Sequence, residues 1–192
     1  MTLCLFEDDR VGHLAPLTLT RAAYDLRVGA RTLLENATSF LPADHLILHT
    51  RADLEGVTRL EYSHASVNAD LESRQAGAAN GTLFVNGRWL VREGAVFEAV
   101  KAATRHDQAR AFVQGDVLLA AWHPSPRRDV LEADALGPEA FDGIPVERVG
   151  DAILIERLWD LISDLENRIT HDLTSMGSLG VLEGEIEDGA TI

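Results

Sequence analysis

Short apolar runs alternate with polar loops along the first half of the chain. Residues 2–6 form one such run, which ends at Glu7-Asp8-Asp9 and predicts a buried strand followed by a polar loop. Residues 30–41 carry apolar side chains at helical spacing before Pro42, and residues 45–50 form a second strand-like run. The order of strand, helix and strand is typical of an α/β layer.

Further strand-like runs lie in the middle of the chain. Residues 82–91 contain two apolar pieces on either side of Asn86-Gly87, a dipeptide that favours a turn or a hairpin. A short helical pattern follows at residues 96–103, and residues 111–113 and 117–122 predict two more strands. The pattern as a whole predicts one α/β domain.

The clearest helical pattern begins after Gly150. Asp151 can cap this helix, and apolar side chains then recur every three or four residues as far as Leu173. We therefore predict a connecting helix over residues 151–173 that packs one stripe on the domain or on a neighbouring subunit. The side chains expected to be buried are Leu158, Leu161, Leu165 and Ile169.

The last residues of the sequence have a different composition, rich in glycine and acidic residues. Ile186 and Ile192 lie six positions apart with Gly189 and Ala190 between them, which fits one turn of a hexapeptide-repeat β-helix. A flexible acidic tail is an equally good interpretation of this segment alone. A β-helix needs at least three repeats to bury its core, so the first interpretation implies a natural polypeptide longer than this one.

Composition and charge exclude several classes of protein. The chain has 192 residues and a formal net charge of −14, which makes a nucleic acid an unlikely partner because phosphate backbones would be repelled. Cys4 is the one cysteine, so a disulfide framework and a zinc site built on paired thiolates are excluded. Acidic residues near the amino terminus and the lack of a long apolar run argue against export and membrane insertion. These features favour a cytoplasmic protein.

The densest group of reactive side chains lies between residues 8 and 31. Its arginines can bind phosphate in bidentate fashion, and backbone N–H groups at a loop or helix start can complete an anion site. A network of Arg–Asp pairs that merely holds the loop explains the same residues equally well. Two other sites are unfavourable: His45 and His49 lie too far apart on a strand to share a metal, and Cys4 lies inside an apolar run.

A sequence motif within this group resembles a known family. The run Pro16-Leu17-Thr18-Leu19-Thr20-Arg21, followed by Leu33-Leu34-Glu35, resembles the amino-terminal signature of sugar-phosphate nucleotidyltransferases. The longer run PLTLTRAAYDLRVGARTLLEN looks like divergent sugar nucleotidyltransferases that precede a left-handed β-helix, related to the bifunctional N-acetylglucosamine-1-phosphate uridylyltransferase/acetyltransferase. Only residues 16–35 are specific to the family, although the outline extends over most of the chain.

The chain departs from the family pattern at three places. One glycine, Gly12, remains where the family has a glycine-rich loop, which weakens phosphate binding by backbone N–H groups. Ala22-Ala23 stand where the family has Pro-Lys. Arg88 stands where the family has the metal-binding aspartate after the Asn-Gly turn, so the resemblance alone leaves the expected magnesium ligand missing.

The resemblance implies a fold, a reaction and a set of site residues. The fold would be a three-layer, Rossmann-like nucleotidyltransferase domain over residues 1–173, followed at 174–192 by a linker and the first turn of a truncated left-handed parallel β-helix. The reaction would join a nucleoside triphosphate and a sugar 1-phosphate into an NDP-sugar and pyrophosphate, with Mg²⁺ as cofactor. The implied residues are Arg10, Arg21 and Asp116 for catalysis; Asp8, Asp9, Gly12, Thr18, Asp25, Arg27, Asn86, Gly87 and Arg88 for substrate binding; and Asp8 and Asp116 for the metal.

Two other functions fit the same sequence. The domain could be a catalytically degenerate nucleotide- or sugar-phosphate-binding module attached to a β-helix acyltransferase-like domain, or an arm that presents substrate to that domain. For an active site, at least two of Arg10, Arg21, Arg27 and Arg88 should face one cleft. The resemblance also implies a homo-oligomer, a trimer, when the β-helix is complete.

Overall fold

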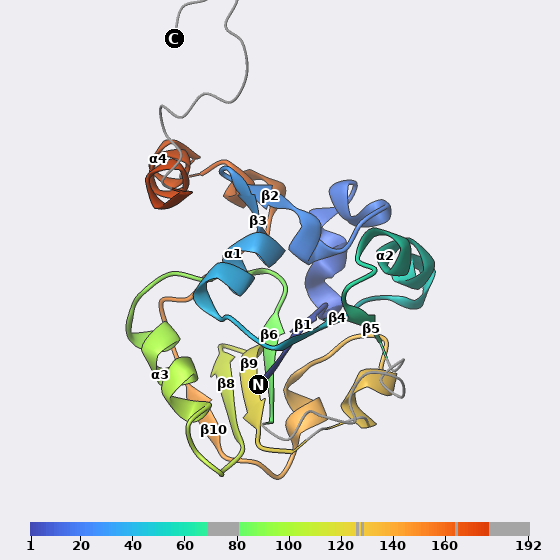
Figure 1. Cartoon of the computed structure of the whole chain (residues 1–192), viewed down its shortest axis with the longest axis vertical. Coiled ribbons are helices and arrows are strands. Elements are labelled where there is room, and N and C mark those ends of the chain that lie inside the picture. Colours follow the sequence, from blue (N-terminus) through green and yellow to red (C-terminus); the bar gives the residue numbers. More distant parts are fainter. Residues whose placement is uncertain (69–80, 126, 128, 164, 177–192) are drawn as a thin grey trace, which may run out of the picture.

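The computed structural model describes residues 1–68, 81–125, 127, 129–163 and 165–176, and these residues form a seven-stranded sheet covered on both faces (Figure 1). The strand order is β10-β8-β9-β6-β1-β4-β5, and β9 is the one antiparallel strand of the described sheet. The strands are β1 (Thr2–Phe6), β4 (His45–His49), β5 (Ser66–Val67), β6 (Thr82–Asn86), β8 (Arg110–Gln114), β9 (Val117–His123) and β10 (Val146–Arg148).

Helices and short ribbons surround this sheet. The α-helices are α1 (Leu33–Phe40), α2 (Glu55–Glu61), α3 (Ala95–Ala103) and α4 (Leu165–Met176). The 3₁₀ turns are η1 (Asp9–Leu14), η2 (Leu17–Leu19), η3 (Ala23–Asp25), η4 (Ala52–Leu54), η5 (Asp129–Glu132), η6 (Pro138–Phe141) and η7 (Leu158–Leu161). Two ribbons pair β2 (Arg27–Val28) with β3 (Arg31–Thr32), and β7 (Trp89–Leu90) with β11 (Ile153–Leu154). None of the helices described is long and apolar enough to span a membrane.

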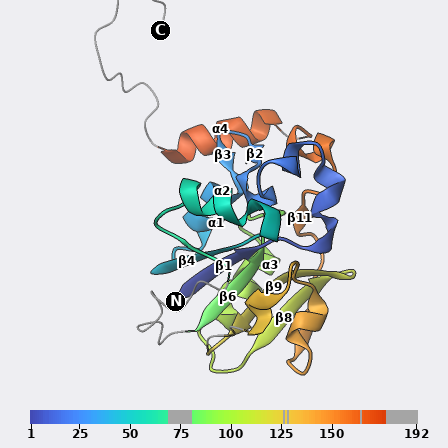
Figure 2. The same cartoon turned by 90° about the vertical axis from the view of Figure 1, so that its right-hand side faces the viewer.

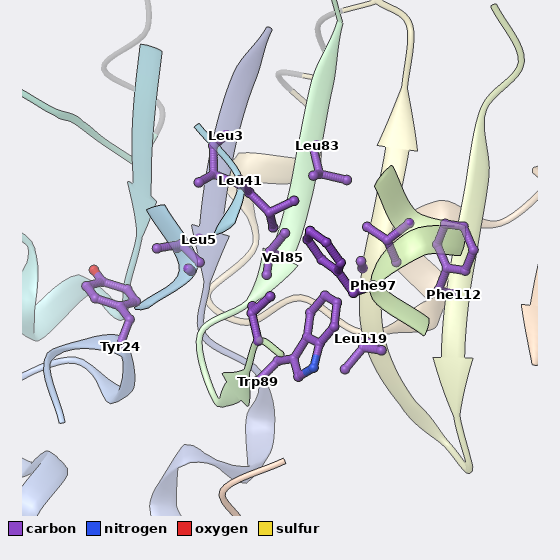
Figure 3. Close-up of a cluster of buried hydrophobic side chains, with 14 of the residues drawn as sticks. Leu3, Leu5, Tyr24, Leu41, Leu83, Val85, Trp89, Phe97, Phe112 and Leu119 are labelled. Carbon is purple, nitrogen blue, oxygen red and sulfur yellow. The ribbon is translucent and has the colours of Figure 1, made fainter. Parts of the chain in front are cut away.

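The central strands are buried on both faces, which explains why they read as continuous apolar runs. On one face, Leu3 and Leu5 of β1 pack with Leu83 and Val85 of β6 beneath α1 and α3 (Figure 3). On the other face, alternate residues of the same strands pack against η5 and η6. The three-layer α/β architecture expected from the sequence is therefore present.

The Asn86-Gly87 turn does not form a hairpin. Residues 82–86 enter the main sheet as β6, whereas Trp89 and Leu90 pair with Leu154 and Ile153 in a separate ribbon. The two strands predicted on either side of Gly115 are confirmed as β8 and β9, and the structure shows that they pair antiparallel. Gly115 adopts a φ of +63°, a conformation that favours glycine.

The predicted helix over residues 151–173 is wrong at its start and in its buried face. An α-helix begins only at Leu165, because residues 153–154 form β11 and residues 158–161 form η7. Leu161 is buried as expected, but Leu165 and Ile169 are 38% and 37% exposed, while Arg168 and Asp172 are buried. Residues 177–192, with the proposed β-helix turn, lie outside the described residues.

The turn between β2 and β3 determines which face of α4 docks. An Asp172 Oδ2 atom accepts a hydrogen bond from the Ala30 backbone N–H at 3.0 Å. A Cβ added at Gly29 would lie 2.6 Å from this same oxygen. The backbone N–H of the turn needs an acceptor, and Asp172 on the polar side of α4 supplies it. Figure 2 shows α4 lying over β2 and β3.

We predict that Gly29→Ala loosens α4 from the domain. Gly29 has a φ of +79°, so alanine there adds backbone strain to the clash with Asp172, and the expected loss of unfolding free energy is about 2–3 kcal/mol. Gly115→Ala is the matched control: its φ is +63° but nothing lies within 4 Å of an added Cβ, so about 1 kcal/mol is expected. Urea unfolding measures the stability of both variants. Faster tryptic cleavage after Arg168 should accompany Gly29→Ala but not Gly115→Ala. Equal losses would contradict this role of Gly29.

Candidate functional site

The candidate site lies at the carboxyl ends of the parallel strands. From β1 the chain passes to β4 and β5 on one side, and β6 then pairs with β1 on the other side. Ligands of open α/β sheets bind at such a reversal of strand order. Asp8 follows β1 at this point, Asn86 ends β6, and Asp116 lies in the turn that begins β9.

A pocket of about 160 Å³ opens beside this point. Its lining comes from the loop after β1, the start of β9 and the segment before η6: Asp8, Asp9, Arg10, Asp116, Val117, Leu118, Ala135, Leu136, Gly137, Pro138 and Glu139. Arg10 is the one basic side chain in this lining, among four carboxylates. Such a surface suits a ligand that carries both phosphate and a cation.

Arg10 is held across the pocket by exposed acidic side chains. The Nη2 atom of Arg10 donates to Asp116, whose side chain is 79% exposed. The Nη1 atom lies 3.9 Å from Oε1 of Glu156. Exposed ion pairs of this kind contribute at most about 1 kcal/mol. An incoming phosphate can therefore replace Asp116 as the partner of Arg10 at little cost.

Asp8 is neutralised by Arg88 beneath the pocket. Arg88 donates through Nε to Asp8 Oδ1 at 2.8 Å and through Nη2 to Oδ2 at 2.5 Å, and both side chains are almost fully buried. Asn86 Nδ2 donates to the same Asp8 Oδ2 at 2.9 Å. A third donor of Arg88, Nη1, binds the Ile155 carbonyl at 3.0 Å. Both oxygens of Asp8 are thus occupied by protein donors.

A second buried carboxylate, Glu7, fixes the neighbouring segment. Glu7 accepts hydrogen bonds from Ala23 N at 2.9 Å, Thr50 Oγ1 at 2.8 Å and Arg51 Nη1 at 2.8 Å. Arg51 also donates through Nη2 to the Thr18 carbonyl at 2.5 Å. This cluster ties residues 18–23, which include part of the Pro-Leu-Thr motif, to the ends of β1 and β4.

The sequence-predicted site residues divide into three groups. Asp8, Asp9, Arg10 and Asp116 line the pocket, and Asn86 and Arg88 lie directly behind it in contact with Asp8. The remaining residues have no place in the lining of this pocket: Gly12, Thr18, Arg21, Asp25, Arg27 and Gly87.

Local contacts explain why several of these residues are set apart. The Thr18 hydroxyl donates to the Val11 carbonyl at 3.1 Å, and Arg27 donates to the Ala30 carbonyl within its own turn. Gly87 N–H donates to the Phe6 carbonyl at 2.8 Å. Arg21 is exposed. Of the four arginines expected to face one cleft, Arg10 lines this pocket, Arg88 lies behind it against Asp8, and Arg21 and Arg27 have no place in its lining.

The family model described as sugar nucleotidyl transferase matches residues 3–178 of the chain, which includes all of the sheet except Thr2 at the start of β1. The chain belongs to the sugar nucleotidyl transferase family. No curated protein matches this family member closely enough to count as a relative.

Solved structures share the fold of this sugar nucleotidyl transferase domain at low sequence identity. A nucleotidyl transferase from Methanothermobacter thermautotrophicus is 13% identical with a TM-score of 0.55, covering 89% of this chain and 99% of the other. Rv0371c from Mycobacterium tuberculosis is 16% identical with a TM-score of 0.54, covering 86% and 96%. A candidate glucose-1-phosphate thymidylyltransferase from Bacillus anthracis, in complex with sucrose, is 10% identical with a TM-score of 0.50, covering 96% and 97%.

Sequence reasoning about this sugar nucleotidyl transferase domain missed Glu7 and Arg51 as a pair. The signal was present, because each residue closely follows a predicted strand, and the carboxyl ends of neighbouring parallel strands meet at one edge. β1 pairs with β4 so that Phe6 lies beside His49, which brings the residues that follow them together. The order of strands in the sheet was the information that the sequence lacked.

Asp25, which the resemblance assigned to substrate binding, accepts a hydrogen bond from a tyrosine hydroxyl, and its environment predicts a pH dependence. Burial raises the pKa of Asp25 from 3.8 to about 6, although the Tyr62 hydroxyl donates to its Oδ1 at 2.6 Å. Because the folded state favours the protonated carboxyl, Asp25 makes its full contribution to the free energy of unfolding below about pH 4. That contribution is lost as the pH rises through 6. Relative to Asp25→Asn, the unfolding free energy of the unmodified protein should fall by about 1–2 kcal/mol between pH 4 and 7, after allowance for partial exposure. Parallel pH curves in urea unfolding would contradict this.

Proposed function

We propose that this protein transfers a nucleotidyl group to a sugar 1-phosphate and releases pyrophosphate. The observation that supports this best is the pocket at the carboxyl end of β1, where Arg10 faces acidic residues in a member of the sugar nucleotidyl transferase family. A phosphate oxygen of the sugar 1-phosphate would attack the α-phosphorus of the nucleoside triphosphate. The bond from this phosphorus to the bridging oxygen would break, and pyrophosphate would leave with that electron pair.

Arg10 is the residue to which we assign phosphate binding. Its guanidinium can form two parallel hydrogen bonds with a phosphate, a geometry that also fixes the orientation of the reacting group. The present partners of Arg10, Asp116 and Glu156, are exposed and can be displaced. Asp8, Asn86 and Arg88 act as positioning residues in this proposal, since they hold the loop that carries Arg10.

Mg²⁺ fits this pocket only when substrate phosphates supply part of its coordination. In the described part of the chain, no group of three or more His, Cys, Asp or Glu side chains is placed to hold a metal. Mg²⁺ commonly takes one or two carboxylates together with substrate phosphates, and Asp9 and Asp116 line the pocket beside Arg10. These two residues would hold the ion, whereas Asp8 has both oxygens engaged. The bound ion would neutralise phosphate charge during transfer.

A specific observation favours a second function, that of a degenerate binding module attached to a β-helix acyltransferase-like domain. The family position for a metal-binding aspartate holds Arg88, which is buried against Asp8. Such a module would bind a nucleotide or a sugar phosphate without turnover.

Two measurements on one panel of nucleoside triphosphates and sugar 1-phosphates separate the two functions. We expect pyrophosphate release with Mg²⁺ for at least one pair, and calorimetric binding of both members of that pair. Binding without pyrophosphate release across the panel would support the binding module, and neither binding nor release would contradict both proposals.

The sequence alone supports our proposals on cellular location and oligomeric state. We infer a cytoplasmic protein that does not bind nucleic acid, because the chain has one cysteine and a net charge of −14. A chain with a complete β-helix after residue 174 would be expected to form trimers.

A further inference from the structure

An apolar stripe remains uncovered along α4 and the segment that leads into it. We call this set the α4 stripe; it consists of Trp159, Ile162, Leu165, Ile169 and Leu173, with exposed fractions of 64%, 66%, 38%, 37% and 36%. Of the eleven exposed large apolar side chains among the described residues, these five lie within fifteen positions. Single exposed apolar residues are ordinary, but five of them within one short segment indicate an interaction surface.

The fold prevents the α4 stripe from turning inward. Arg168 and Asp172 are buried on the side of the helix that meets the β2–β3 turn, and Asp172 is bound to Ala30 N there. Rotating α4 to bury Ile169 would break this hydrogen bond and expose the turn. Figure 2 shows α4 along one margin of the molecule, where Leu165, Ile169 and Leu173 are exposed.

We propose that the α4 stripe binds a second copy of this chain in a two-fold symmetric, antiparallel helix pair. Residues 165, 169 and 173 follow one another at four-residue spacing and lie along one face of the helix. A two-fold axis through Ile169 therefore places Leu165 of each copy opposite Leu173 of the other. Such an interface is self-complementary, because one patch serves both copies.

The area of the stripe is sufficient for this pairing. Five partly exposed large side chains offer about 400–500 Å² of apolar surface per copy, which is roughly 900 Å² for the pair. With the polar residues at its rim, the contact reaches the range of about 1,200 Å² where specific interfaces begin. We therefore expect a dimer of moderate affinity, with dissociation in the micromolar range.

Charge also favours this face for contact between copies. The chain carries a net charge of −14, so two copies repel each other over most of their surface. The five members of the α4 stripe are uncharged. Among the described residues between them in the sequence, the acidic side chains are Asp160, Glu166 and Asp172, and Asp172 is buried. The chain's own residues 177–192 are a poorer occupant, since they contain four carboxylates and neither lysine nor arginine.

Sedimentation equilibrium of the full 192-residue chain tests the pairing. We expect the mass to rise with concentration from 20.9 kDa toward twice that value, and Ile169→Glu to raise the dissociation constant at least tenfold. Leu60→Glu is the matched control, because Leu60 is 85% exposed on α2, away from α4. A protein that stays at 20.9 kDa up to 100 µM, or a loss of pairing equal in both variants, would overturn the proposal.

Cross-linking tests the position of the two-fold axis. Cys4 is fully buried and burial raises the pKa of its thiol, so it does not compete with a new surface thiol. Under mild oxidation, Ile169→Cys should give a disulfide-linked dimer, whereas Leu60→Cys should not. If residues 177–192 cover the stripe instead, Ile169→Cys will stay monomeric and resist alkylation, which would overturn the proposal. A trimeric mass would contradict the two-fold pairing.

Discussion

Arg88→Met is expected to lower the free energy of unfolding by about 3–5 kcal/mol, because it leaves the buried Asp8 carboxylate without a counterion. The Arg88 guanidinium supplies two hydrogen bonds to Asp8 and one to the Ile155 carbonyl. Methionine fills a similar length but provides neither charge nor donors. Urea unfolding followed by circular dichroism measures the loss, and a destabilised loop after β1 should accompany it.

Two companion variants isolate the ion pair as the cause. Arg88→Met combined with Asp8→Asn removes both charges, and we expect it to recover at least half of the lost stability. Arg110→Ala breaks an exposed pair with Glu147 and should cost less than about 1 kcal/mol. A loss below about 1 kcal/mol for Arg88→Met, or a double variant no better than the single one, would refute a stabilising role for the pair.

Arg10→Ala is expected to lower kcat/KM about 100-fold, on the proposed function, because it removes the basic side chain of the pocket. A fixed cation that meets developing phosphate charge contributes on this scale when water is partly excluded. Arg10→Lys keeps the charge but not the bidentate geometry, so an intermediate loss is expected. Pyrophosphate release measures all three proteins with the best substrate pair.

Arg21 provides the matched control for Arg10. Both are arginines of the same amino-terminal region, but Arg21 is exposed and does not line the pocket. We expect Arg21→Ala to change kcat/KM less than about threefold, which is within the usual scatter of neutral surface substitutions. A loss for Arg21→Ala that equals the loss for Arg10→Ala would place the phosphates outside this pocket.

Most of the strands and several residues of the candidate site could be predicted because both depend on short stretches of sequence. Residues 2–6 (TLCLF) and 46–48 (LIL) are short apolar runs, as largely buried strands require. Asp8, Asp9 and Arg10 follow the first of these runs, so their place at the strand end needed no tertiary information. Asp116, which the resemblance assigned to catalysis and to the metal, lies in the same pocket.

The roles of charged partners could not be predicted because they depend on distant residues. Asp8 and Arg88 are 80 positions apart, and only the pairing of β1 with β6 brings them together. The resemblance placed Arg88 where the family has a metal-binding aspartate. It could not show that the Arg88 guanidinium forms an ion pair with the Asp8 carboxylate. Periodicity in residues 158–173 likewise revealed an apolar stripe but not that the β2–β3 turn would hold the polar side of α4.

The most direct test of the account is to map ligand binding on the backbone amides by NMR. The protein is titrated with the nucleoside triphosphate and sugar 1-phosphate that perform best in the panel, in the presence of Mg²⁺. We predict that the largest shift changes fall on Asp9, Arg10, Asp116 and Gly137, which line the pocket at the end of β1. Changes concentrated instead at Arg92, Asn167 and His171, which line a separate pocket beside α4, would contradict the central claim.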